Sequence, residues 1–282
     1  MNAIEMLNEK ILEKLNQGII PWKQSWKSMQ RPRNAFTNRP YRGLNTWLLS
    51  GYEQSGWLTF NQVKKFHGSV NAGEKASYVF FFTTNYMRKT KDEEGNVSYE
   101  TVELDQPVMR TYAVFNVMQC YFPKEIKEKL YDHVETKNNP IESCESIINN
   151  YQGMPQVVPG EPAYYPLSDI ISMPTMERFN AVESYYAVLF HEMTHSTGHK
   201  DRLNRFKSIY NESRKDYGFE ELVAEFGASY LLNHVGIEQL EENAAYIQGW
   251  AKAIKDDKYL LMKAASQGEK AYNYITGGNY EN

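Results

Sequence analysis

Apolar residues recur at helical spacing from the start of the chain. The stretch A-I-E-M-L-N-E-K-I-L-E-K-L-N-Q-G, residues 3–18, has an apolar side chain at every third or fourth position, at Ile4, Leu7, Ile11 and Leu15. This spacing predicts an amphipathic helix, and Gly18 suits its C-terminal cap. The next residues, 20–45, contain Pro, Asn and Gly at short intervals, which indicates irregular backbone.

The pattern then predicts two further helices followed by two strands. One helix begins at Thr59, whose hydroxyl suits an N-cap, and ends near Gly68. Continuous apolar runs without helical spacing indicate buried strands. The predicted elements are a short helix at 46–50, a helix at 59–68, a buried strand at 76–86, a charged hairpin or loop at 87–98 and another strand at 108–119.

A charged, turn-rich segment from about 123 to 138 separates two halves of the chain. We place a domain boundary there, which gives domains of residues 1–130 and 131–282. The predicted fold class is α+β, and the first domain is mixed α/β. The second half is expected to hold a helix at 141–151, a strand-like stretch at 163–174, a long helix around the histidines, a helix at 217–234 and a mostly helical tail from 237.

The composition fits a globular cytoplasmic protein. Hydrophobic residues make up 41% of the 282 residues, enough for a sizeable core. No apolar run reaches the about 18 residues of a membrane span, and the first residues lack the pattern of a signal peptide. Cys120 and Cys144 form no disulfide framework and are expected to be free thiols in a reducing compartment. We therefore expect no membrane contact.

The net charge of −4 conceals an uneven distribution along the chain. From Lys10 to Lys91, fourteen Lys and Arg stand against three Glu, a net charge of +11, and the remainder carries −15. A basic half suits a polyanion such as nucleic acid. An acidic half with clustered histidines suits a metal ion instead, so the two halves are expected to meet different partners.

Three of the six histidines lie within the nine residues H-E-M-T-H-S-T-G-H, which end at His199. On a helix, His191 and His195 point toward the same small volume and can share one metal ion. Glu192 is placed to touch a water in the open position of that ion, and we expect it to be the catalytic acid and base of an HExxH peptidase. One zinc ion per chain is expected, with manganese as the alternative because ligand geometry decides.

A third protein ligand has to come from another segment. F-E-E-L-V-A-E holds Glu221 and Glu225 four residues apart, on one face of a predicted helix, with a spacing similar to the E-x-x-x-D of gluzincins. Glu221 is the expected ligand. Glu225 is expected to orient a ligating histidine, with a surface charge as the alternative. The neighbouring Glu220 stays an alternative ligand, and so does His199, although its direction on a regular helix differs by about 80° from that of His191.

Aromatic rings and cations alternate along residues 22–47. This mixture is typical of sequence-nonspecific binding to single-stranded nucleic acid, because cations follow the backbone and rings stack on any base. No zinc finger, RNP motif or helix-turn-helix indicates base-specific recognition. The competing interpretation places the rings in the core and the cations on a solvated face. The candidate DNA-binding residues are Trp22, Lys23, Trp26, Lys27, Arg31, Arg33, Arg39, Tyr41 and Arg42.

Several separate segments resemble the ArdC antirestriction proteins, whose N-terminal domain also begins some conjugative plasmid primases. They run in the same order over residues 3 to about 235. One departure is Ser196, where many members carry Trp, which removes an aromatic residue from the rim of the site. The matching segments are P-W-K-Q-S-W, R-N-A-F-T-N-R-P-Y-R-G-L-N, W-L-T-F-N-Q, Y-A-V-F-N-V-M-Q, A-Y-Y-P-L-S-D-I-I-S-M-P, H-E-M-T-H-S-T-G-H-K-D-R-L-N-R and E-E-L-V-A-E-F-G-A.

The resemblance implies an N-terminal domain that binds single-stranded DNA without sequence preference and a C-terminal zincin-like metallopeptidase domain. His191, Glu192 and His195 match the family's metal motif, and the segment E-E-L-V-A-E matches the third ligand. Such proteins travel on mobile elements and protect incoming DNA from restriction. We expect a zinc-dependent peptidase that acts on an unidentified protein at or near single-stranded DNA. The alternative is a DNA-binding shield whose metal site is structural or inactive.

Overall fold

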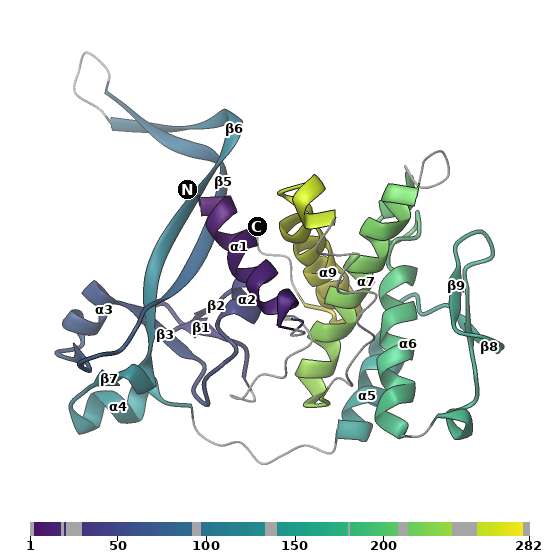
Figure 1. The fold of residues 1–282 in the computed structure, drawn as a ribbon. Coiled ribbons are helices and arrows are strands. Elements are labelled where there is room, and N and C mark those ends of the chain that lie inside the picture. Colours follow the sequence, from purple (N-terminus) through teal and green to yellow (C-terminus); the bar gives the residue numbers. More distant parts are fainter. Residues whose placement is uncertain are drawn as a thin grey trace.

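The chain folds into a sheet-rich first half and a helical second half. The computed structural model describes residues 3–17, 20, 30–91, 97–132, 140–179, 181–207, 214–238 and 253–278. The first half is built on a five-stranded sheet, and the second on a group of helices with a three-stranded sheet beside it (Figure 1). This arrangement confirms the predicted α+β class.

The N-terminal sheet combines three short strands with one long antiparallel ribbon. Its strands are β1 (Arg33–Asn34), β2 (Arg39–Pro40), β3 (Gly56–Thr59), β5 (Ser77–Lys91) and β6 (Val97–Asn116), in the order β2-β1-β3-β6-β5. The ribbon of β5 and β6 extends well beyond the other strands (Figure 1). This half also contains the strand pair β4 (Ser69–Val70) and β7 (Cys120–Tyr121), and the helices α1 (Ala3–Asn16), α2 (Leu44–Leu48), α3 (Phe60–Lys65) and α4 (Lys124–Leu130).

The helices predicted for this half are present, with small shifts at their ends. Helix α3 begins after Thr59, whose hydroxyl accepts a hydrogen bond from the backbone N–H of Gln62. The Gln62 side chain accepts one in return from the backbone N–H of Thr59. This capping box satisfies two N–H groups of the first turn, which explains why the helix begins there. In α1, the four apolar positions of the sequence pattern are all buried, at Ile4, Leu7, Ile11 and Leu15.

Two predictions for this half are wrong. The segment 123–138, predicted to be turn-rich, contains helix α4. The strand predicted to be buried is buried only in part: Val79 and Phe80 face two different hydrophobic clusters, whereas Phe81 and Phe82 are 46% and 42% exposed. The difference arises because other elements cover both faces of the ribbon near its base only.

The described part of the second half contains several helices and a small mixed sheet. Its helices are α5 (Pro140–Asn150), α6 (Val182–Ser196), α7 (Arg214–Val235) and α9 (Leu260–Thr276). Its strands are β8 (Gln156–Pro159), β9 (Ala163–Tyr165) and β10 (Ile170–Met173), in the order β8-β10-β9. The stretch predicted as one strand at 163–174 is therefore a pair of antiparallel strands, and β8 is an element that the pattern did not predict.

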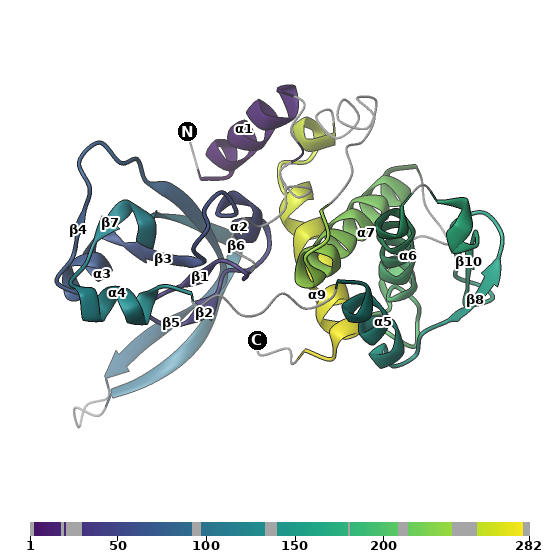
Figure 2. The same ribbon diagram turned by 90° about the horizontal axis from the view of Figure 1, so that it is seen from below.

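Helix α7 lies between α6 and α9 (Figures 1 and 2). Two glycines allow the helices to approach closely. A Cβ atom at Gly227 would overlap the side chain of Thr194 on α6, and one at Gly268 would lie 2.6 Å from the Cβ of Phe226 on α7. The position of α7 against α6 is therefore closely determined, and these are the two helices that carry the candidate metal ligands.

One hydrophobic cluster joins the two halves. It contains Leu7 and Leu15 of α1, Trp47 of α2 and Phe80 of β5, together with apolar residues of α7 and α9. The ring centroids of Trp47 and Tyr230 lie 5.0 Å apart, and the Tyr230 hydroxyl donates a 2.9 Å hydrogen bond to the carbonyl of Gly43. The boundary between residues 130 and 131 stays a prediction, and the core is continuous across it.

Both cysteines are free, as predicted, and both are buried. Burial raises the pKa of Cys120 to about 11 and the pKa of Cys144 to about 12. Because the reactive form of a cysteine is the thiolate, these thiols are expected to be inert at neutral pH. Within the described residues, no helix has both the length and the apolar character needed to cross a membrane.

Candidate metal centre

Two histidines of α6 and one glutamate of α7 converge on a single point. The Nε2 atoms of His191 and His195 lie 3.1 Å apart. The carboxylate of Glu221 spans the two rings, with Oε2 3.5 Å from Nε2 of His191 and Oε1 3.5 Å from Nε2 of His195. Within the described residues, these three form the one group of His, Cys, Asp and Glu whose donor atoms lie within 4.8 Å of one another.

A second carboxylate lies behind each histidine. Oε1 of Glu225 is 3.7 Å from Nδ1 of His191, and Oε1 of Glu220 is 3.5 Å from Nδ1 of His195. Both rings therefore direct Nε2 toward the shared point and Nδ1 toward a glutamate. Metal-ligating histidines are commonly held in this way, because the outer carboxylate fixes the ring orientation and raises the basicity of the ligand.

Arg205 holds Glu220 in place. Its guanidinium donates two hydrogen bonds to the Glu220 carboxylate, of 2.7 and 3.1 Å, one to the hydroxyl of Thr197 and one to the carbonyl of Thr194. Burial would raise the pKa of Glu220, but its hydrogen bonds to His195 and Arg205 outweigh burial, and the pKa is lowered. Glu220 is therefore a charged partner of His195, and among the α7 side chains that the structure describes, Glu221 is the one that directs a carboxylate at both Nε2 atoms.

The donor set suits a divalent cation. Burial would lower the pKa of His191, but the hydrogen bond that its ring donates to Glu221 and the charges of Glu225 and Glu192 outweigh burial, and the pKa is raised. The side chain of Glu225 is only 15% exposed, and Glu192 is 7% exposed. Charged groups that are removed from water are normally paired or coordinate a metal. Imidazole nitrogens with a carboxylate oxygen form a common ligand set of zinc sites and also suit manganese.

Access to the cluster is from the Glu221 side. The Glu221 side chain is 34% exposed, whereas those of His191 and His195 are 19% and 13% exposed. The backs of both helices are buried: Leu189 and Phe190 of α6 belong to one hydrophobic cluster, and Leu222 of α7 belongs to another. A rigid apolar backing of this kind keeps ligands in position when a substrate approaches.

His199 lies outside the three-residue cluster. Helix α6 ends at Ser196, and Nδ1 of His199 accepts a hydrogen bond from the backbone N–H of Asp201. Ser196 itself is fully buried and hydrogen-bonded to Tyr151 at 2.9 Å. The interpretation of position 196 as part of the rim is therefore wrong, because the Ser196 side chain is buried against Tyr151, the residue directly after α5.

The hydroxyl of Tyr164, on strand β9, is hydrogen-bonded within the protein. It donates a 2.7 Å hydrogen bond to Asp169 and accepts one of 3.1 Å from Arg202. Burial and the bond to Asp169 raise its pKa. Arg202 also pairs with Asp169 and donates to the carbonyl of Ser196, so this network joins the β9–β10 turn to the end of α6.

The predicted DNA-binding residues fall into three groups. Trp22, Lys23, Trp26 and Lys27 lie outside the described residues. Arg31 pairs with Glu269 of α9, Arg33 pairs with Asp132 at 2.9 Å, and Tyr41 is 5% exposed. Arg39 and Arg42 are exposed. A phosphate contact from Arg31 or Arg33 would compete with an internal ion pair, whereas the exposed side chains of Arg39 and Arg42 can be reached from solvent.

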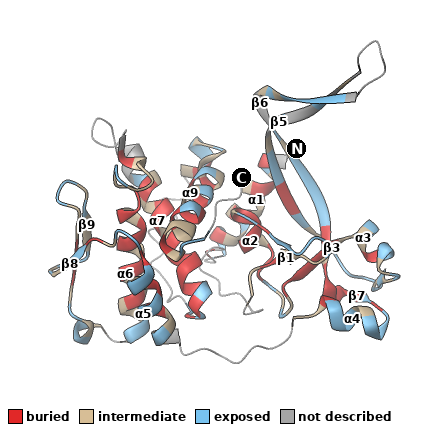
Figure 3. Cartoon of the chain, turned by 180° about the vertical axis from the view of Figure 1, so that it is seen from behind, coloured by how far each residue is buried: buried red, intermediate tan, exposed pale blue. Residues whose placement is uncertain are grey.

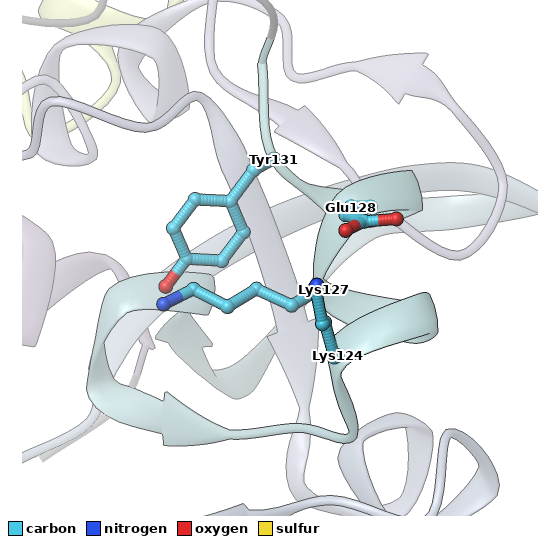
Figure 4. Close-up of a pocket in the computed structure, with 4 residues that line it drawn as sticks. All are labelled: Lys124, Lys127, Glu128 and Tyr131. Carbon is cyan, nitrogen blue, oxygen red and sulfur yellow. The ribbon is translucent and has the colours of Figure 1, made fainter.

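A hollow of about 380 Å³ lies beside α4, away from the cluster (Figure 4). Its lining residues are Lys124, Lys127, Glu128 and Tyr131, and the Lys127 ammonium lies 4.9 Å from the centre of the Tyr131 ring. It shares no residue with the metal cluster. A single carboxylate between two lysines offers no ligand set for a metal ion.

The sequence pattern did not predict a role for Arg205 at the site, and it offered Glu220 only as an alternative ligand. The signal available was the pair of arginines in D-R-L-N-R, directly after the histidine motif. Arginine next to an acidic helix often forms a bidentate pair with a carboxylate. The identity of that carboxylate depends on how α7 packs, which the spacing of residues does not reveal.

The comparisons with known proteins define the class of each half. A family model for the N-terminal domain of anti-restriction factor ArdC matches residues 1–115. A second model, for zincin-like metallopeptidases, matches residues 142–267. The chain is therefore built from an ArdC-type N-terminal domain followed by a zincin-like metallopeptidase domain, as the resemblance implied.

The chain belongs to the ArdC antirestriction family. It is similar to crystal structures of the antirestriction protein ArdC from plasmid R388. The metal-free form has 30% identity, a TM-score of 0.72, and coverage of 98% of this chain and 97% of that one. The Mn(II)-bound form has 30% identity, a TM-score of 0.73 and complete coverage of both chains. A divalent ion in this relative agrees with the donor set described above.

Two further relatives are similar in sequence to this chain over most of its length. The DNA primase TraC of Escherichia coli is 29% identical over 287 residues, which cover 96% of this chain and 20% of the primase. The uncharacterized protein y4eC of Sinorhizobium fredii is 27% identical, with 91% of this chain and 84% of that protein covered. The chain thus spans about a fifth of the length of the primase.

Replacing Glu220 by Gln is expected to weaken metal binding about 10- to 100-fold, because His195 loses its charged outer partner. The apparent affinity is measured by titrating the metal-free chain with Zn²⁺ or Mn²⁺ in competition with a chelating dye. Glu183→Gln, at an exposed position of the same α6 helix, is the matched control and is expected to bind as the wild type does. An unchanged affinity for Glu220→Gln would contradict the orienting role.

Proposed function

We propose that the chain is a metallopeptidase that acts on proteins held at single-stranded DNA, and that this activity contributes to its antirestriction role. The observation that carries the proposal is the convergence of His191, His195 and Glu221, with Glu192 buried one residue from the first ligand. A site kept only for structure would use the three ligands and would have no need of a fourth acid at that position.

The proposed roles follow from where the side chains lie. His191, His195 and Glu221 would hold the ion, while Glu225 and Glu220 orient the two rings. When bound, a divalent ion of this kind supplies Lewis-acid polarisation of a carbonyl group and lowers the pKa of a water molecule.

Glu192 is the proposed proton carrier. Its carboxylate accepts a proton from the attacking water and then donates it to the nitrogen of the leaving peptide, and it is regenerated at the end of the cycle. The exposed edge of Glu221 marks the side from which the peptide enters.

The DNA-binding part of the proposal rests on the N-terminal half. Its family model is that of ArdC, and its sequence relatives include a primase, a protein that works on DNA. The strong positive charge between residues 10 and 91 supports a polyanionic ligand. Aromatic residues among the cations favour single strands over duplex, because only unpaired bases offer their faces for stacking. Binding would bring protein substrates near the peptidase site and raise their effective concentration.

The test is proteolysis of a protein covalently attached to a single-stranded oligonucleotide. The metal-loaded chain is expected to cut the attached protein at least about 100-fold faster than the same protein free in solution, because attachment replaces a second binding event. A metal chelator is expected to abolish cleavage, and excess Zn²⁺ or Mn²⁺ to restore it.

The rival function is a shield that covers DNA without cutting protein. If the metal-loaded chain binds the oligonucleotide tightly and leaves the attached protein intact, the peptidase proposal fails and the shield is favoured. Cleavage that is insensitive to the chelator would equally contradict a metal-dependent peptidase.

A further inference from the structure

We propose that single-stranded DNA stacks on the outer face of the β5–β6 ribbon, at a surface formed by Phe81, Tyr112 and Arg110. We call this surface the ribbon face. The inference rests on the proposed binding of single-stranded DNA and specifies where the strand lies. None of the three ribbon residues belongs to the aromatic and basic segment that the sequence pattern singled out.

The strand register places these side chains together. Phe81 pairs with Arg110, and Val79 pairs with Tyr112, so Phe81 and Tyr112 are diagonal neighbours on the same face. Their ring centroids lie 5.5 Å apart in an edge-to-face arrangement. The side chains are 46% and 44% exposed, an unusual state for two adjacent rings on a strand.

The ribbon face continues from a buried base into solvent. Val79 and Val114 belong to this face and are covered by a cluster with Tyr41, Leu49 and Trp57. Two residues further along β5, this cover ends at Phe81, whose ring lies 6.5 Å from that of Tyr41. Much of the ribbon beyond its base is exposed (Figure 3). The packing of the base holds the two exposed rings at a fixed position, as a stacking surface requires.

The opposite face of the ribbon is occupied. Phe80 and Met109 pack into the cluster that joins the two halves. The ring of Phe82 contacts that of Tyr259 at 6.3 Å, and the Lys10 ammonium lies 4.5 Å from the centre of the Tyr78 ring. On this face Phe80 and Met109 are therefore held in the core, and the two rings beside them that stay partly exposed, Tyr78 and Phe82, each have a contact from outside the ribbon.

Positive charge accompanies the exposed rings. Arg110 is exposed directly opposite Phe81, and the described residues include no carboxylate within ion-pair distance of its guanidinium. Rings beside cations match a strand that offers base faces and phosphates together, and they match a lipid or an apolar peptide less well. The excess of positive charge in this half adds long-range attraction for the same ligand.

The test measures the binding of a dye-labelled oligothymidylate to variants of the full chain by fluorescence anisotropy. The ring-deleted variants are compared at one salt concentration, and Arg110→Gln is compared with the wild type over a series of salt concentrations. Phe81→Ala and Tyr112→Ala are each expected to weaken binding about fivefold or more, the loss typical of one stacked base. Tyr112→Phe keeps the ring and is expected to bind as the wild type does. Arg110→Gln is expected to weaken binding and to reduce the slope of log affinity against log salt by about 0.7.

The matched control is Phe60→Ala with Tyr121→Ala, which removes two rings of the same half that are 49% and 65% exposed but lie elsewhere. This control is expected to bind as the wild type does. Unchanged binding by Phe81→Ala with Tyr112→Ala, or an equal loss in the control, would overturn the ribbon face while leaving DNA binding intact. Absence of binding by the wild type would overturn the proposed DNA binding itself.

Thermal unfolding midpoints show whether each variant is folded. Arg110→Gln tests the same surface without removing a ring that packs against its neighbours.

Discussion

Glu192→Gln is expected to reduce cleavage of a DNA-attached protein by about 10² to 10⁴-fold, the usual contribution of a positioned general acid and base. Gln has nearly the same shape but cannot accept the proton of the attacking water. Metal content is expected to stay unchanged, because the three converging donors are those of His191, His195 and Glu221. Cleavage is followed by gel electrophoresis under single-turnover conditions, and metal content by elemental analysis of the same samples.

The matched control for this variant is Glu183→Gln, which changes an exposed carboxylate at the start of the same helix. It is expected to cleave at the wild-type rate. If Glu192→Gln retains full cleavage, Glu192 is not the proton carrier. If it retains full DNA protection in cells while its metal stays bound, antirestriction does not depend on proteolysis and the shield function is favoured.

The second large effect is expected from Glu221→Ala. Loss of a residue that only orients a ligand typically weakens metal binding by up to about 100-fold. Loss of Glu221, one of three protein ligands, is expected to weaken metal binding by more than this. Glu225→Ala, which removes only the group behind His191, is expected to stay within about 10- to 100-fold. Both affinities are measured by competition with a chelating dye, so that the two glutamates are compared on one scale.

The order of these two variants decides the third ligand. Glu221 lies 3.5 Å from both Nε2 atoms, whereas Glu225 lies 3.7 Å from the Nδ1 atom of His191 alone. A greater loss for Glu225→Ala than for Glu221→Ala would show that the ring of His191 is reversed and that Glu225 is the ligand. Equal, small losses for both would place the third ligand outside α7.

How much of the site was predictable depends on whether its residues share one element. His191 and His195 lie on one helix, so helical spacing alone places their rings together, and Glu192 follows from its position between them. The third ligand lies on α7, and its direction depends on the antiparallel packing of α7 against α6. The sequence therefore left Glu220, Glu221, Glu225 and His199 as alternatives, and only the folded chain distinguishes their surroundings.

The surface of the first half was less predictable for the same reason. Arg31 and Arg33 have the sequence context of solvated cations, yet they pair with Glu269 and Asp132, which lie 238 and 99 residues away. Phe81 belongs to a continuous apolar run, the usual sign of a buried strand. Phe81 is exposed because the β5–β6 ribbon is longer than the elements that pack over its base. The pattern of residues along one strand does not reveal how far those other elements extend.

The most direct test of the account is the metal content of the purified chain, prepared without chelators, for the wild type and for His195→Ala. We predict about one divalent ion per wild-type chain, as in other three-ligand sites of zincin type, and its loss in His195→Ala without unfolding. Absence of bound metal in the wild type, or equal metal content in both proteins, would contradict a metal centre at His191, His195 and Glu221 and with it the peptidase function.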